Sequence, residues 1–218
     1  MKVTLAAGNR QELRRLIEER LKDSRPPTDS SSAVPAGFSA EVDAAVRQYF
    51  PASPAAAAVL VPIVDREDGL TVLLTQRATH LKNHAGQISF PGGRIEGADE
   101  GPLAAALRET EEEIGLSRQH VTFTGYLEPH LVLTGYWVTP VVGFVQPGFA
   151  LHLDHREVDS TFEVPLLHVL DVANHKARER MLGTTKVRVY DIPYGEHHIW
   201  GATAGMLMSL YKLLNSHT

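Results

Sequence analysis

Four glutamates stand within five residues near the middle of the chain, in the stretch Arg108-Glu109-Thr110-Glu111-Glu112-Glu113. On an α-helix, at about 100° per residue, Glu109, Glu112 and Glu113 share one face, whereas Glu111 points elsewhere. Clustered carboxylate oxygens are hard ligands that suit Mg²⁺ or Mn²⁺. Such a cluster also describes an ordinary acidic, solvated helix face, so the surrounding residues must decide between a metal site and a surface.

The neighbouring residues predict where this helix begins and ends. Pro102 suits a first helical turn, where its missing N–H costs nothing, and Gly115 suits the exit. The apolar side of the helix is expected to be a narrow stripe made of Leu103, Leu107, Thr110 and Ile114. We therefore predict a helix over residues 102–114 that carries a metal face beside a core stripe.

Apolar and β-branched runs predict a sheet around this helix. The expected strands are residues 57–64, 70–76, 87–90, 121–127, 136–145 and 187–192. The expected additional helices are residues 41–50, 165–171 and 202–214. Asp68-Gly69 indicates a hairpin between the first two strands, and Pro91-Gly92-Gly93 is expected to break regular structure. Strands that alternate irregularly with helices favour an α/β (α+β) fold with a mixed sheet covered by helices.

The first quarter of the chain has a different composition. Residues 10–23 space Leu13, Leu16, Ile17 and Leu21 at helical intervals, and residues 24–39 are rich in Pro and Ser. We predict that residues 1–53 form a helical arm with a Pro/Ser-rich linker, and that residues 54–218 form the domain that carries the chemistry. The arm is expected to be an accessory packed on the domain or a homodimer contact, rather than a catalytic part.

Composition limits the classes of function. The 218 residues include no Cys, which excludes disulfides, thiolate metal sites and a cysteine nucleophile. The formal charge is −5, so a general basic field for nucleic acid is absent, and no nucleic-acid partner is expected. No apolar run approaches the roughly 18 residues that cross a bilayer. We therefore expect a cytoplasmic protein without a membrane segment.

Residues 93–116 resemble the Nudix box, G-x5-E-x7-R-E-U-x-E-E-x-G-U, where U is aliphatic. The stretch from Arg108 to Leu116 fits the second half, except that Thr110 occupies a U position. The first half contains one inserted residue. Asp99 has the expected spacing from Gly93, whereas Glu100 has the expected spacing to Arg108, so either residue can fill the first acidic position.

The sequence before the box is similar to the signature of the coenzyme A diphosphatase branch of that family. The similar residues are Leu73-Leu74-Thr75-Gln76-Arg77, Leu81, His84, Gly86 and Phe90-Pro91-Gly92-Gly93, with further pieces at 157–158, 164–166 and 199–203. The resemblance covers roughly residues 55–215. It implies the Nudix fold, in which a mixed β-sheet is sandwiched between helices and carries a loop-helix-loop catalytic motif.

The resemblance also implies roles for the acidic residues. Glu109 and Glu113 would bind the metal, with Glu112 as a third ligand or a partner through water, and with the carbonyl group of Gly92. Arg108 would pair with the box carboxylates and orient them. Water would attack a phosphorus of the diphosphate, and either Glu112 or Glu157 would accept its proton.

The implied substrate is coenzyme A or one of its thioesters, cut to 3′,5′-ADP and a 4′-phosphopantetheine. Arg77, His84 and Arg94, together with Gly93, would contact the phosphates or the pantetheine arm, although His84 could equally staple its own loop. A broader nucleoside-diphosphate-X or nucleoside triphosphate hydrolase is the alternative within the same chemistry. A non-catalytic binding module is disfavoured because it would not need all three glutamates.

Overall fold

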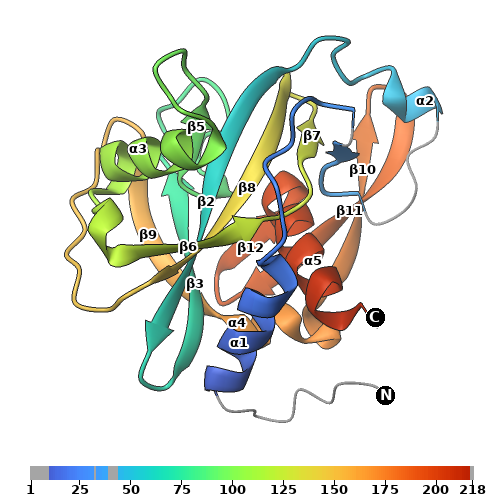
Figure 1. Cartoon of the computed structure of the whole chain (residues 1–218). Helices are drawn as coiled ribbons and strands as arrows, with labels where there is room; N and C mark the ends of the chain where they lie inside the picture. Colours follow the sequence, from blue (N-terminus) through green and yellow to red (C-terminus); the bar gives the residue numbers. More distant parts are fainter. Residues whose placement is uncertain (1–9, 32, 39–43, 217–218) are drawn as a thin grey trace.

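The computed structural model describes residues 10–31, 33–38 and 44–216 (Figure 1). Its helices are α1 (Arg10–Leu21), α2 (Ala44–Arg47), α3 (Pro102–Ile114), α4 (Leu166–Leu170) and α5 (Gly201–Asn215), with 3₁₀ turns at Arg118–His120 and Val172–Asn174. Its strands are β1 (Val34–Pro35), β2 (Ala55–Arg66), β3 (Gly69–Arg77), β4 (Ile88–Ser89), β5 (Gly92–Arg94), β6 (Val121–Tyr126), β7 (His130–Val132), β8 (Tyr136–Val145), β9 (Val158–Pro165), β10 (Lys176–Leu182), β11 (Thr185–Tyr194) and β12 (His197–Trp200).

Strand β2 is the centre of a mixed sheet with the strand order β1-β7-β8-β2-β3-β4. It pairs with β3 through the predicted hairpin and with β8 in parallel, from Ala55 opposite Tyr136 to Val64 opposite Val145. Strand β9 pairs with β3, β6 pairs with β8, and the short β5 pairs with the first half of β2. Because β2 is covered on both faces, its sequence is a nearly continuous apolar run.

The residues of β2 alternate between two apolar cores. Ala58, Leu60 and Val64 pack with Ala105 and Ala106 of α3 on one face. The odd-numbered residues Ala57, Val61 and Ile63 belong to a larger core on the other face, together with residues of α1, α4 and α5. The mixed sheet between helices is therefore confirmed, and α3 lies on the face opposite α5 (Figure 1).

Helix α3 has the predicted bounds. Pro102 occupies its first turn, and Gly115 ends it in the left-handed conformation at φ 69°, where glycine has no Cβ to clash. Thr110 and Ile114 of the predicted stripe are fully buried, but Leu103 and Leu107 are only partly buried, and Ala105 and Ala106 are fully buried instead. The helix is therefore rotated toward its glutamate face, and that face lies close to the sheet.

Several segments depart from the sequence prediction. Pro91-Gly92-Gly93 was expected to break regular structure, but Gly92–Arg94 forms β5. Gly92 allows this close approach to β2, because a Cβ there would lie 2.4 Å from the carbonyl oxygen of Ala58. The predicted helix over residues 41–50 is present only as α2, and residues 41–43 lie outside the described residues. The prediction omitted five strands, β1, β7, β9, β10 and β12. Of these, β10 is exposed and rich in charge, so it lacks the apolar alternation that indicates a strand.

The N-terminal segment is packed on the main core. Leu13, Ile17 and Leu21 of α1 are buried in the same apolar cluster as α5. Ser24 continues this attachment, because its hydroxyl oxygen accepts a hydrogen bond from the backbone N–H of Tyr126 at 2.9 Å. No helix among the described residues is both long and apolar enough to span a bilayer.

Candidate active site

The three glutamates of the predicted metal face differ sharply in exposure. The side chain of Glu113 is only 5% exposed, that of Glu109 is 17% exposed, and that of Glu112 is 60% exposed. Helix α3 packs against β2 and β5, so Glu113 and Glu109 point toward the sheet, while Glu112 lies on the solvent side of the helix. Buried Glu113 and partly buried Glu109 are therefore the carboxylates that can act away from bulk water.

Glu113 is held at the edge of β5. The backbone N–H of Gly92 donates to its Oε2 at 3.0 Å, and Nη1 of Arg77 lies 3.8 Å from its Oε1. Burial raises the pKa of Glu113 to about 7, because the Gly92 hydrogen bond and Arg77 only partly offset the loss of water, and Glu157 and Glu109 add repulsion. A bound cation would favour the ionised form of this carboxyl.

Glu109 is in a similar environment beside Gly93. Burial raises the pKa of Glu109, Arg108 lowers it, and the charges of Glu112 and Glu157 raise it further. A Cβ atom added to Gly93 would lie 2.5–2.7 Å from the carboxylate atoms of Glu109. Glycine at position 93 therefore makes the room that the Glu109 carboxylate occupies.

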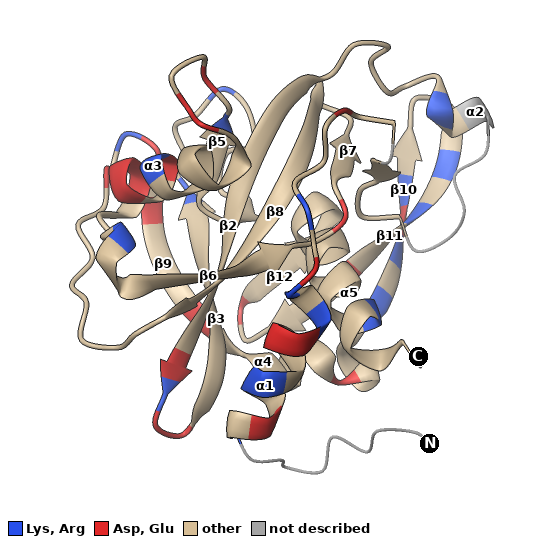
Figure 2. Cartoon of the chain, in the orientation of Figure 1, with Lys and Arg blue, Asp and Glu red and all other residues tan. Residues whose placement is uncertain are grey.

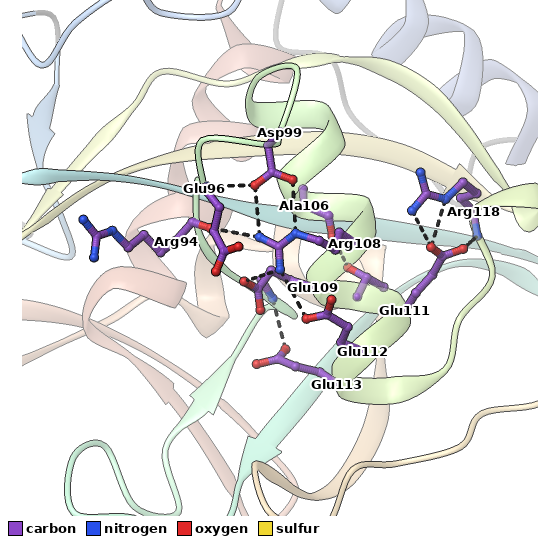
Figure 3. Close-up of polar contacts among 12 residues, drawn as sticks. Arg94, Glu96, Asp99, Ala106, Arg108, Glu109, Glu111, Glu112, Glu113 and Arg118 are labelled. Carbon is purple, nitrogen blue, oxygen red and sulfur yellow. Dashed lines mark hydrogen bonds and ion pairs between the residues drawn. The ribbon is translucent and has the colours of Figure 1, made fainter.

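Arg108 connects the helix to the preceding loop, as Figure 3 shows. Its Nε and Nη2 donate to the two carboxylate oxygens of Asp99 at 3.1 and 3.0 Å, and Nη2 also donates to the carbonyl oxygen of Arg94 at 3.1 Å. Its Nη1 donates to Glu109 at 2.9 Å and to Glu112 at 3.2 Å. The arginine thus pairs with the box carboxylates, but its two-point partner is Asp99.

The loop geometry separates the two candidates for the first acidic position. Asp99 bonds Arg108 and also accepts the backbone N–H of Glu96 at 2.8 Å, and both contacts lower its pKa. Glu100 is exposed. The inserted residue is therefore accommodated after Asp99, with Glu100 turned to the surface.

A pocket of about 1110 Å³ opens beside Glu109 and Glu113. Arg108 and Glu112 are outside its lining. The other predicted site residues all line it: Arg77, His84, Gly92, Gly93, Arg94 and Glu157, besides Glu109 and Glu113 themselves. Glu157 stands next to the end of β3, because its carbonyl oxygen accepts the N–H of Ala78 at 2.8 Å. The structure therefore brings these residues to one cavity, although they come from four separate segments.

Arg77 and His84 have different environments in that pocket. The Nε of Arg77 is buried and has no hydrogen-bond partner among the described residues, so the guanidinium retains a donor for a ligand. His84 has a positive φ of 58°, and its Nδ1 lies 2.7 Å from Oε1 of Gln87. This contact is the loop-stapling bond considered above, and His84 lines the pocket as well.

Glu111 is separate from the site. Its carboxylate accepts hydrogen bonds from the backbone N–H of Arg118 at 2.8 Å and from that residue's guanidinium at 2.9 and 2.5 Å. Figure 3 shows this pair on the far side of the helix from the other glutamates. Glu111 therefore fastens the end of α3 to the following turn.

Comparison with known proteins agrees with this geometry. The NUDIX domain family matches residues 54–182. The chain is 43% identical over 155 residues to the uncharacterized Nudix hydrolase NudL of Escherichia fergusonii, covering 71% of this chain and 80% of that protein. The NudL protein of Escherichia coli K12 is 42% identical over the same coverage. The chain belongs to the Nudix family.

Solved structures of other Nudix proteins are more distant. A binary complex of the Caenorhabditis elegans Ap4A hydrolase is 22% identical, with a TM-score of 0.45, covering 51% of this chain and 80% of that one. The Mycobacterium smegmatis Nudix hydrolase RenU is 23% identical, with a TM-score of 0.46, covering 54% of this chain and 74% of that one.

This Nudix hydrolase acts on diphosphate bonds, and enzymes of the family generally use Mg²⁺ or Mn²⁺. Among the described residues, no three Asp, Glu or His side chains converge closely enough to enclose an ion as they stand. Arg108 holds Glu109 and Glu112, and the Gly92 N–H holds Glu113. The donor set still suits a hard cation, because buried Glu113 and partly buried Glu109, both with raised pKa values, face one cavity.

Part of the pocket wall of this Nudix hydrolase consists of residues that the sequence did not predict to line the site. Ala36 and Phe38 line the pocket, although residues 1–53 were predicted to have no part in the chemistry. Trp200 also lines it, at the beginning of α5. Gly37, Gly201 and Gly205 could have indicated this contact, because glycines often mark places where two backbones approach each other closely.

Proposed function

We propose that this Nudix hydrolase cuts the diphosphate of coenzyme A and its thioesters, giving 3′,5′-ADP and 4′-phosphopantetheine derivatives. The observation that supports the proposal is one continuous pocket that joins partly buried Glu109 and buried Glu113 to Arg77 and extends well beyond them. The pocket volume of about 1110 Å³ exceeds the volume that a single nucleotide fills, so the pocket can hold a long substituent as well.

In this proposal Glu109 and Glu113 hold Mg²⁺ or Mn²⁺ together with the carbonyl oxygen of Gly92, and the more exposed Glu112 is a partner of the metal through water. The cation would neutralise phosphate charge and lower the pKa of bound water. Arg108 is a positioning residue, because it fixes Glu109 and Glu112 while itself anchored on Asp99.

Glu157 is the proposed general base. It lines the pocket, whereas Glu112 is outside the lining and held by Arg108. Its carboxylate is near enough to Glu109 and Glu113 to affect the pKa of both. We assign Glu157 to accept the proton of the attacking water, and Arg77, Arg94 and His84 to contact the phosphates, with Gly93 leaving room for them.

The substrate proposal is tested by offering the purified protein CoA, acetyl-CoA, ADP-ribose, NADH and dGTP with Mg²⁺ or Mn²⁺, and separating the products by chromatography. We expect CoA and acetyl-CoA to give the highest kcat/KM, with release of 3′,5′-ADP. Equal or faster turnover of ADP-ribose or dGTP would reject the CoA assignment and favour a broader nucleoside-diphosphate-X or triphosphate hydrolase.

The base is tested by comparing Glu157→Gln with Glu112→Gln across pH. Loss of the general base should lower kcat and remove the acid limb of the rate profile. We expect this pattern for Glu157→Gln. The same pattern in Glu112→Gln alone would transfer the role to Glu112.

A further inference from the structure

The pocket has two chemically different ends. All the acidic and basic residues of its lining lie around α3, β5 and the loops beside them: Arg77, Lys82, Arg94, Glu109, Glu113 and Glu157. The opposite end is lined by side chains without formal charge, including Phe38, Val132, Leu133, Tyr136, Val189 and Met206. Figure 2 shows the acidic residues of α3 on one side and the Lys and Arg residues of β10 and β11 well away from them.

Strand order gives the length of this apolar end. The sheet runs from β5 to β2, β8, β7 and β1 in adjacent pairs, and Val59, Val138 and Val132 of these strands line the pocket. Neighbouring strands lie about 4.8 Å apart, so the four steps from β5 to β1 span about 19 Å. A chain of about sixteen atoms in extended form, at about 1.2 Å per bond, is therefore needed to reach from the glutamates to β1.

The wall at the far end is the segment of residues 33–38. Its strand β1 pairs with β7, where Ala36 N–H donates to the carbonyl oxygen of Leu131 at 2.8 Å. On its other side, the carbonyl oxygen of Gly37 accepts the N–H of Tyr190 at 2.8 Å, and Phe38 forms a bridge with Val189. The segment therefore joins the mixed sheet to a separate three-stranded sheet of β10, β11 and β12, and it places Phe38 at the pocket.

Close backbone contacts fix the position of residues 33–38 against α5. A Cβ on Gly37 would lie 2.3 Å from the carbonyl carbon of Gly201, and a Cβ on Gly205 would lie 2.4 Å from the nitrogen of Gly37. Both distances are shorter than real contacts allow, so the segment lies directly against the first turns of α5. Ala36 and Phe38 thus belong to the same wall as Met206 of that helix.

We propose that residues 33–38 form a specificity-determining wall, and that the compartment they close takes the apolar acyl chain of a thioester substrate. This inference rests on the proposed function. Within the described lining, no cation at this end could pair with a second phosphate, and desolvating an unpaired phosphate there would be costly. Leu133 and Tyr136 remain 41% and 36% exposed, so they offer apolar surface that a chain can cover.

The first test measures kcat/KM for CoA, butyryl-CoA and octanoyl-CoA. Burial of one methylene strengthens binding by up to about fourfold, so octanoyl-CoA should exceed butyryl-CoA by at least about tenfold, through a lower KM. The preference should fall severalfold in Phe38→Ala. Phe123→Ala is the matched control, because Phe123 is exposed on β6 outside the pocket lining, and it should keep the preference. Equal values for the three substrates would overturn the proposal.

A second variant covers the case in which Phe38→Ala fails to fold. Leu133 is partly exposed, so Leu133→Asn should fold normally and still reduce the octanoyl preference. A folded Leu133→Asn protein that keeps the full preference would contradict the assigned wall and compartment.

Direct binding separates this inference from the substrate proposal. S-octanoyl-pantetheine lacks the diphosphate, and its binding can be compared with that of pantetheine by calorimetry. Tighter binding of the octanoyl compound, lost in Leu133→Asn, would support the compartment even if CoA itself were not hydrolysed. Hydrolysis of CoA without any binding advantage for the octanoyl compound would reject the compartment and leave the proposed function standing.

Discussion

The guanidinium of Arg108 meets both carboxylate oxygens of Asp99, with Nε 3.1 Å from Oδ1 and Nη2 3.0 Å from Oδ2. Its third nitrogen, Nη1, is left to face Glu109 and Glu112. A fork of this geometry fixes the plane of the guanidinium, which a lysine ammonium could not do. The loop before α3 thereby sets the position of the helix's acidic side chains.

This relationship predicts that Asp99→Asn weakens metal use. Partners that orient metal ligands typically contribute 10–100-fold to metal affinity or activity, and the variant should need correspondingly more Mg²⁺ or Mn²⁺. The measurement is the hydrolysis rate as a function of metal concentration. Glu100→Gln is the control, because Glu100 is exposed, and it should behave as the parent protein. A larger defect in Glu100→Gln would reverse the assignment.

Removing the carboxylate of either Glu109 or Glu113 should abolish most activity. Glu109→Gln and Glu113→Gln keep side-chain size but lose a charged oxygen ligand, so we expect turnover to fall by about 10³-fold or more. Circular dichroism should show an intact fold. Glu111→Gln is the matched control on the same helix, because its partner is Arg118 at the surface. Near-normal turnover in the Glu109 or Glu113 variant would disprove its role as a metal ligand.

The raised pKa of Glu113 predicts an unusual pH dependence of stability without metal. A carboxyl with a folded pKa of about 7 stabilises the fold fully below about pH 4.5, and this contribution is lost as pH rises through 7. The loss should be of the order of 3 kcal/mol in the free energy of unfolding. Added Mg²⁺ should therefore raise Tm more at pH 8 than at pH 5.5.

Comparison with Glu113→Gln isolates this effect, because other groups titrate in the same range. Burial lowers the pKa of His130 to about 4, so its contribution is lost as pH falls below about 6.5, opposite to that of Glu113. The difference in unfolding free energy between parent and Glu113→Gln removes the His130 contribution. A pH-independent difference would show that Glu113 has an ordinary pKa.

Gly93→Ala should damage the site more than the fold. Its new Cβ would fall on the Glu109 carboxylate, which must then move. We expect turnover to drop by about 10-fold to 100-fold while Tm changes by only a few degrees. Gly97→Ala is the control, since nothing lies within 4 Å of a Cβ at that position. Unchanged turnover in Gly93→Ala would mean that Glu109 functions equally well elsewhere.

The helix α3 could be predicted from the sequence because its signals are local. Pro102 and Gly115 mark its ends, and the 3.6-residue period places its glutamates on one face. The sequence could not show whether Asp99 or Glu100 fills the first acidic position of the box. Only the folded loop determines which of the two carboxylates reaches Arg108. The burial of Ala105 also depends on how closely the helix approaches the sheet, which periodicity does not determine.

The pairing of β1 with β7 could not be predicted either. Val34 and Pro35 are two residues of an otherwise Pro/Ser-rich segment, and their partners His130 and Leu131 lie about a hundred residues later. A two-residue strand gives no alternation to recognise. The role of the segment becomes visible only when the sheet brings it to the pocket.

Helix α1 is expected to belong to the folding unit of the Nudix domain, although residues 54–182 alone match the family. Ile17 is completely buried, so Ile17→Ala should cost about 2–4 kcal/mol in the free energy of unfolding, measured in urea. Glu19→Ala, on the exposed side of the same helix, should change it by less than about 0.5 kcal/mol. Equal effects of the two substitutions would show that the arm folds separately.

The parallel pairing of β2 with β8 has a kinetic consequence. Residue 55 pairs with residue 136, and the segment between them contains β5 and all of α3. This pairing can form only after a loop of about eighty residues has closed, and contacts of such long sequence separation slow folding. Helix α3 therefore gains its contact with β8 late in refolding, and we expect hydrolytic activity to recover more slowly than far-ultraviolet circular dichroism.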